Sequence, residues 1–247
     1  MLNATLLKRV DLTKDLIFVH VKPDAGVPDF LPGQYVALGL PDKSSTSEKM
    51  KLIKRAYSIG SPSHEKNHIE FYIAIVDGGE FTPLLAALQE GDRLHIAPKI
   101  TGTFVLKNAP ETANFVFVST GTGIAPFMAM LRTPSTWENG RKVTIVNGVR
   151  YQSDLAYVDE LQEMIKNGRN LEYYNIVSRP TETWKGERGY VQRFFQEDII
   201  KINPETDHVF ICGNPSMIED LQKVLETKGY KEHSKKSPGN LHLEKYW

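Results

Sequence analysis

The chain has 247 residues, and its 30 lysines and arginines balance its 30 aspartates and glutamates, so the formal net charge is zero. This balance argues against a protein that coats nucleic acid or anionic membrane, and the single cysteine excludes internal disulfides and multi-thiolate metal sites. No apolar run approaches the ~20 residues of a membrane span, and residues 1–14 lack a signal-peptide pattern. The seven histidines do not cluster at ligand spacing, so we expect no metal site. Together these features predict a cytoplasmic, globular protein without a membrane or nucleic-acid partner.

The N-terminal part of the chain predicts short β-strands. Apolar, β-branched and aromatic residues gather in segments that Pro and Gly interrupt, at 6–10, 16–21, 33–40, 55–60, 68–76, 93–97 and 102–106. Strands at this spacing are typical of an antiparallel barrel or sandwich. Residues 83–89 are the exception and predict a short helix with Pro83 in its first turn.

Beyond residue 109 strands and helices alternate. Strands are expected at 114–119, 143–149, 171–178 and 208–212. Helices are expected at 125–131, after Ser153 as a cap, and after Asn214-Pro215. This alternation predicts a doubly wound parallel sheet, so the chain divides into an all-β domain over residues 1–108 and an α/β domain over residues 109–247.

A glycine turn, Gly-Thr-Gly-Ile-Ala-Pro at residues 121–126, lies between the first strand and first helix of the α/β part. Glycines let a phosphate approach the backbone, and the start of a helix offers free N–H groups. The third glycine of the usual dinucleotide pattern is replaced by Pro126, and a purely structural turn is the alternative. The position directly after the first strand favours a nucleotide site.

Two further motifs frame this turn: Arg-Ala-Tyr-Ser at residues 55–58 and Cys-Gly at residues 212–213. With all three motifs in this order, essentially the whole chain resembles the ferredoxin (flavodoxin)–NADP reductases, members of the two-domain FAD/NAD(P) reductase superfamily. The resemblance implies an N-terminal antiparallel Greek-key β-barrel that binds FAD, followed by a doubly wound parallel α/β domain that binds NADP.

The resemblance assigns Arg55 to the FAD pyrophosphate, Tyr57 to stacking on the isoalloxazine and Ser58 to a hydrogen bond near flavin N5. These roles suit the side chains, because a guanidinium pairs bidentately with phosphate and a tyrosine ring offers a flat apolar wall. The other residues at positions of family flavin contacts are Ala56, Tyr72, Glu80, Phe81, Thr82 and Thr120.

Cations after the later strands indicate NADP. Ser178 and Arg179 follow a strand and suit a dianionic 2′-phosphate. By resemblance to plastid-type reductases, Arg188 takes a phosphate-binding lysine position and Tyr190 stacks on adenine, with Gln192 after it. Bacterial members often have Gly-Arg-aliphatic where this chain has Gly-Tyr-Val. The alternative is that both arginines are solvated surface charges. The resemblance adds these residues of the nucleotide site: Gly121, Thr122, Gly123, Arg150 and Gly213.

Four further residues are expected near the reaction. The family places a thiol beside nicotinamide C4, which assigns Cys212, although a small buried hydrophobe is the alternative. Glu244 matches a family carboxylate implicated in proton supply, or is a plain surface acid. The terminal Tyr246 and Trp247 match aromatics that cover the flavin or contact adenine, or simply anchor the tail.

We therefore expect a monomeric FAD-dependent reductase that transfers electrons between NADP(H) and a one-electron carrier, flavodoxin or ferredoxin, by hydride transfer at flavin N5. Two alternatives stay open: a reductase of the same fold for a ferric chelate, free flavin or an oxygenase component, and a flavin-binding subunit without turnover. Two lysine-bearing segments, residues 42–54 and 231–236, are candidate docking sites for the carrier or simply solvated loops. The first segment carries Lys43, Lys49, Lys51 and Lys54.

Overall fold

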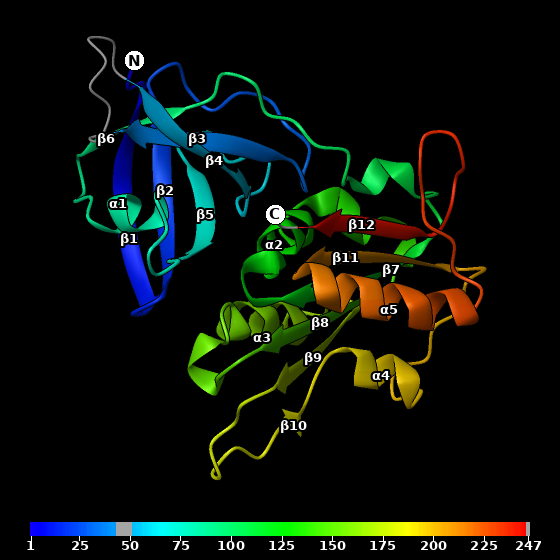
Figure 1. The fold of residues 1–247 in the computed structure, drawn as a ribbon. Helices are drawn as coiled ribbons and strands as arrows, with labels where there is room; N and C mark the ends of the chain where they lie inside the picture. Colours follow the sequence, from blue (N-terminus) through cyan, green and yellow to red (C-terminus); the bar gives the residue numbers. More distant parts are fainter. Residues whose placement is uncertain (43–50, 246–247) are drawn as a thin grey trace. The chain divides into compact units, whose positions relative to one another are not determined.

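The computed structural model describes residues 1–42 and 51–245 (Figure 1). Tyr246 and Trp247, expected at the cofactors, lie outside the described residues, as do Lys43 and Lys49 of the first docking segment. Contacts divide the chain into two units, Met1–Val105 with Ala125–Thr133, and Leu106–Ile124 with Pro134–Trp247. The domain boundary between residues 108 and 109 stays a prediction.

The first unit contains a six-stranded antiparallel sheet with the order β4-β3-β6-β1-β2-β5. The outer strands β4 and β5 are in contact, so the sheet curls into the predicted barrel. Alternating side chains of β2, Ile17, Val19 and Val21, are buried in its core. The elements are β1 (Ala4–Thr13), β2 (Leu16–Pro23), β3 (Tyr35–Pro41), β4 (Leu52–Ser58), β5 (Ile69–Ala74), α1 (Thr82–Ala86) and β6 (Arg93–Ile96).

The strand predicted at residues 102–106 is wrong. Gly102 has a φ of +124°, outside the range of β-strands, and before it Thr101 forms only an isolated bridge with Tyr35. Phe104 and Val105 are nevertheless buried, which explains the apolar pattern. The chain then enters a 3₁₀ turn at Leu106–Asn108.

The second unit contains a six-stranded sheet in which every pair is parallel, with the order β10-β9-β8-β7-β11-β12 (Figure 1). All seven residues of the central strand β8 are buried, as expected for a sheet covered on both faces. The strands are β7 (Asn114–Thr120), β8 (Val143–Val149), β9 (Leu171–Val177), β10 (Glu187–Arg188), β11 (Asp207–Gly213) and β12 (Leu241–Lys245).

Four helices accompany the second half of the chain: α2 (Ala125–Leu131), α3 (Val158–Lys166), α4 (Gln192–Gln196) and α5 (Pro215–Thr227). Apolar residues of α4 and α5 form one core with the strands β7, β8 and β11, while α2 belongs to the first unit. Within the described residues, no helix combines the length and apolar character needed to cross a bilayer.

Two helix starts differ in how well the sequence predicted them. Asn214 caps α5 as expected, because its side chain accepts hydrogen bonds from the backbone of Ser216 and Met217. Ser153 is not a helix cap, and that prediction is wrong. It lies in a 3₁₀ turn, Gln152–Asp154, and α3 begins only after Tyr157, whose φ is +60°.

Candidate flavin and nucleotide sites

The end of β4 carries the Arg-Ala-Tyr-Ser motif. The Arg55 guanidinium donates from Nη2 to Glu80 Oε2 at 2.9 Å and from Nη1 to the carbonyl of Lys54 at 2.9 Å. Both side chains of the Arg55–Glu80 pair are at least half exposed, so the pair is weak in water. The structure therefore brings together two predicted residues and leaves a solvent-accessible guanidinium that fits an anionic ligand.

Tyr57 and Ser58 are less exposed than Arg55. Burial raises the pKa of the Tyr57 phenol, against a smaller opposing effect of the Arg55 cation, so the phenol is neutral. The Tyr57 ring lies 5.9 Å from that of Phe81, which is buried in the barrel core. Ser58 is buried. The neutral Tyr57 ring, the Arg55 cation and the Ser58 hydroxyl together form a combination of groups that fits a flavin dinucleotide.

The remaining predicted flavin residues of the first unit have structural contacts. Tyr72 is buried, and its ring stacks on Phe18 at 4.6 Å. The Thr82 hydroxyl accepts the backbone N–H of Val76 at 2.8 Å, which closes the turn that presents Glu80. Ala56 is exposed on β4.

The glycine turn forms a 3₁₀ turn, Gly121–Ile124, between β7 and α2. Gly121 has a φ of +54°, and no atom of the described residues lies within 4 Å of the position of a Cβ. At Gly123, by contrast, a Cβ would stand 2.3 Å from the carbonyl oxygen of Cys212. One glycine therefore faces open space that fits a phosphate, and the other allows the turn to pack on the end of β11.

Thr120 and Gly213 complete this packing. The Thr120 hydroxyl accepts the backbone N–H of Asn214 at 3.0 Å, and a Cβ at Gly213 would stand 2.3 Å from that hydroxyl oxygen. Gly213 also has a φ of +146°. The C-terminal ends of β7 and β11 are therefore packed tightly against each other. Thr122, in the glycine turn, is only partly exposed.

Cys212 is completely buried in β11, and β12 places Glu244 directly beside it in register. The thiol donates a hydrogen bond to Glu244 Oε2 at 3.7 Å. These two predicted catalytic residues are therefore neighbours, which the sequence did not reveal because β12 was not predicted as a strand.

The predicted phosphate-binding cations follow β8 and β9. The Arg179 N–H donates to the Arg150 carbonyl at 2.8 Å, so the two residues are adjacent, and both are exposed. The Ser178 hydroxyl donates to Val149. Arg188 donates from Nη2 to the carbonyls of residues 181, 182 and 184, at 3.3, 3.4 and 2.9 Å. Its guanidinium therefore also stabilises the loop at residues 181–184.

Tyr190 and Gln192, which follow Arg188 in the chain, differ in burial. Tyr190 is 71% exposed, so its ring is available for stacking. Gln192 begins α4, and its Oε1 is buried without a hydrogen-bond partner among the described residues.

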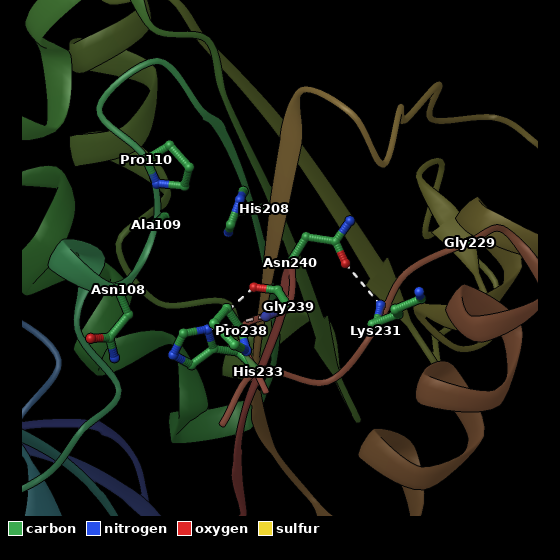
Figure 2. A pocket seen from close by; sticks show the side chains of 10 residues that line it. All are labelled: Asn108, Ala109, Pro110, His208, Gly229, Lys231, His233, Pro238, Gly239 and Asn240. Carbon is green, nitrogen blue, oxygen red and sulfur yellow. Dashed lines mark hydrogen bonds between the residues drawn. The ribbon is translucent and has the colours of Figure 1, made fainter. Parts of the chain in front are cut away.

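A pocket of about 640 Å³ lies at the other end of the parallel sheet, where β11 and β12 begin (Figure 2). His208 and His233 line it, and His208 Nδ1 lies 3.0 Å from Nε2 of the buried His242. Sequence spacing missed this cluster, because it forms only when β12 pairs with β11. Among the described residues, no group of three or more His, Cys, Asp or Glu is arranged to hold a metal ion.

Comparison with known proteins agrees with this division of motifs. Residues 3–104 match the oxidoreductase FAD-binding domain family, and residues 117–223 match the oxidoreductase NAD-binding domain family. The flavodoxin/ferredoxin–NADP reductase of Buchnera aphidicola is 33% identical over 100% of this chain and 98% of its own length. The ferredoxin–NADP reductase of Pseudomonas aeruginosa is 34% identical over 87% of this chain and 86% of its own.

Among solved structures, a ferredoxin–NADP⁺ reductase from Neisseria gonorrhoeae with bound FAD and NADP shares the fold, with a TM-score of 0.87 and 24% identity over 98% of this chain and 97% of that one. A barrel with an Arg-x-Tyr-Ser strand, followed by a parallel sheet with a glycine turn, defines a flavin- and nicotinamide-dependent oxidoreductase. The chain belongs to the flavodoxin/ferredoxin–NADP reductase family. The predicted fold class is confirmed. The predicted enzyme class and the cofactors FAD and NADP(H) are confirmed by the family models and the curated relatives.

Proposed function

We propose that this enzyme carries electrons between NADP(H) and flavodoxin or ferredoxin, as a cytoplasmic monomer. The observation that carries the proposal is the presence in one chain of an accessible Arg55 beside Tyr57 and of an open Gly121 beside the Cys212 strand end. FAD, when bound, supplies the step between two-electron hydride chemistry and one-electron transfer. The names of the relatives support the choice of carriers.

In the flavin site, Arg55 would bind the pyrophosphate through its exposed guanidinium, and Glu80 would give up part of its contact. Tyr57 would present a neutral ring to the isoalloxazine, and the Ser58 hydroxyl would hydrogen bond near N5. The turn closed by Thr82 would hold Glu80 and Phe81 at the edge of this site. Tyr72 acts from the neighbouring strand by supporting the aromatic packing.

In the nucleotide site, Gly121 would leave room for the pyrophosphate, with Thr122 and Gly123 shaping the turn. The exposed side chains of Arg150 and Arg179, whose backbones are hydrogen bonded to each other, would bind the 2′-phosphate, since arginine cations suit a dianion. Ser178 supports that strand end. Arg188 would contribute charge while holding the loop at residues 181–184, and Tyr190 would stack on adenine before Gln192 begins α4.

Near the reacting atoms, Cys212 would set the position of the nicotinamide as a buried wall rather than as a nucleophile. Glu244 would accept a hydrogen bond from the thiol, which turns the S–H bond away from the ring. The Glu244 carboxyl group would also hold a proton for the reaction.

The test is steady-state reduction of purified flavodoxin, purified ferredoxin, a ferric chelate and free flavin by the FAD-loaded protein, with NADPH and with NADH. We expect NADPH to bleach the visible flavin absorbance and one of the two carriers to be the best acceptor. Faster reduction of the chelate or of free flavin would replace the carrier in this proposal by another acceptor. A protein that stays colourless with FAD, or that is not reduced by NADPH, would overturn it.

A further inference from the structure

Arg132, directly after α2, forms a clamp within the first unit. Its Nη1 donates to the carbonyl oxygen of Gly60 at 2.8 Å and to Glu70 Oε1 at 2.7 Å. The two charged side chains are only 19% and 13% exposed. Because water is largely excluded, this ion pair is held more firmly than the exposed pairs of the surface.

The clamp acts on the end of the flavin strand. Gly60 lies two residues after Ser58, and its N–H donates to the Glu70 carbonyl at 2.8 Å. The Glu70 N–H in turn donates to the hydroxyl of the buried Ser61 at 3.1 Å. Glu70 therefore holds residues 60 and 61 through its backbone, and through its carboxylate by way of Arg132.

The surroundings make Arg132 hard to replace. Glu70 Oε2 lies 3.4 Å from His20 Nε2, and the His20 ring stacks on that of His68 at 4.3 Å. Arg132 is the cation that bridges both the Gly60 carbonyl and the Glu70 carboxylate from a single nitrogen. A lysine would keep the charge, but its ammonium is a point charge on a side chain of different shape and does not reproduce the guanidinium at this position.

We propose that Arg132 and Glu70 are positioning residues for the reaction at the flavin. They hold the residues that follow Ser58, and so keep the Ser58 hydroxyl in its place beside Tyr57. Arg132 directly follows the seven-residue helix α2, which begins directly after the glycine turn, so the clamp is also close along the chain to the nucleotide motif. This inference rests on the proposed role of Ser58 in the flavin site.

The test uses the FAD-loaded enzyme and the variants Arg132→Gln, Arg132→Lys, Glu70→Gln and the double variant Arg132→Gln/Glu70→Gln. Flavin reduction by NADPH is followed in single turnovers, normalised to bound FAD. Small displacements of a reacting group cost up to about a hundredfold in rate, so we expect Arg132→Gln to slow reduction by at least about tenfold. The lysine variant should recover part of the rate.

A positioning role is separated from general destabilisation by three further measurements. The dissociation constants of FAD and NADP⁺ and the melting temperature should change little in the folded double variant, in which both members of the Arg132–Glu70 pair are neutral, while its reduction stays slow. Arg93→Gln removes the exposed ion pair with Asp24 in the same unit and should leave reduction unchanged.

Reduction at the wild-type rate in the folded Arg132→Gln variant or in the folded double variant would overturn the inference, as would a rate loss that follows FAD loss alone. If the single variants do not fold, the double variant decides. Failure of the wild-type protein to bind FAD or to accept electrons from NADPH would instead contradict the proposed function.

Discussion

The thiol of Cys212 donates a hydrogen bond to the carboxylate of Glu244 across two neighbouring parallel strands, with an Sγ–Oε2 distance of 3.7 Å. The residues are 32 positions apart in sequence. The thiol is the donor of this contact, so the S–H bond points toward Glu244. This contact gives Cys212 a defined orientation in the reaction that we propose.

Replacing Cys212 by alanine should therefore slow flavin reduction by NADPH by about tenfold, while KM for NADPH changes less than about threefold. Cys212→Ser retains a donor for Glu244 and should lose less. Stopped-flow single turnovers give the rate and steady-state kinetics give KM. An alanine variant that reduces its flavin as fast as the wild type would show that Cys212 is only a packing residue.

Arg55→Ala should weaken FAD binding by about 2 kcal/mol, or roughly thirtyfold, because it removes a charge-assisted hydrogen bond to the pyrophosphate. Glu80→Gln should have the opposite sign and tighten FAD binding, since it removes the anion that now holds Arg55. Fluorescence titration of the apoprotein with FAD measures both. Lys54→Ala is the matched control on the same strand, and an equal loss there would contradict a specific role of Arg55.

Arg179→Ala should raise KM for NADPH by about tenfold and leave KM for NADH nearly unchanged, because only NADPH carries the 2′-phosphate. Arg188→Ala should affect both nucleotides, since its guanidinium also holds the loop at residues 181–184. Equal effects of Arg179→Ala on NADPH and NADH would refute the phosphate assignment.

Gly123→Ala should lower the free energy of unfolding by about 1–3 kcal/mol, because its Cβ would collide with the carbonyl of Cys212. The Cβ of Gly121→Ala meets no atom of the described residues and should cost only the strain of the positive φ, about 1 kcal/mol, yet it should block phosphate binding. Urea unfolding and NADP⁺ titration separate the two effects. Gly140→Ala, also at a positive φ and facing open space, is the control for strain alone.

The three-histidine cluster should make the protein less stable in acid. Burial, then the charges of His208 and His233, lowers the pKa of His242 from 6.5 to about 3. Burial, then His233, also lowers the pKa of His208, against a small opposing effect of Asp207. Above pH 6.5 these histidines are neutral in both the folded and the unfolded chain, so they do not change the free energy of unfolding. Below that pH the unfolded chain takes up protons first, so stability falls toward pH 3.

His242→Phe should flatten this acid dependence by up to about 1.4 kcal/mol per pH unit, because one suppressed protonation is removed. The phenylalanine keeps the stacking on Phe210, which the imidazole makes at 4.1 Å. Lys231, the cation that lines the same pocket, stays in place (Figure 2). Urea unfolding at several pH values gives the slope, with the exposed His64→Gln as control. An unchanged slope in His242→Phe would assign the acid sensitivity elsewhere.

Local patterns predicted most of the two sheets. The helix at residues 125–131 and the strand at residues 143–149 were predicted with the bounds of α2 and β8, because each is an apolar run between clear turn signals. The prediction failed at Ser153, where the left-handed Tyr157 delays the helix, and at residues 102–106, where Gly102 leaves the β region. It missed β12, which is a strand because β11 pairs with it rather than because of its own pattern.

By itself the sequence determined the order of the cofactor motifs, the alternation that makes a parallel sheet, and the residue types suited to phosphate and flavin. Only the tertiary structure decided which of these residues meet: Arg55 with Glu80, Cys212 with Glu244, and Arg132 with both Gly60 and Glu70. The physical reason is that a motif depends on near neighbours in the chain, whereas these contacts depend on strand register and on how a helix ends against a barrel strand.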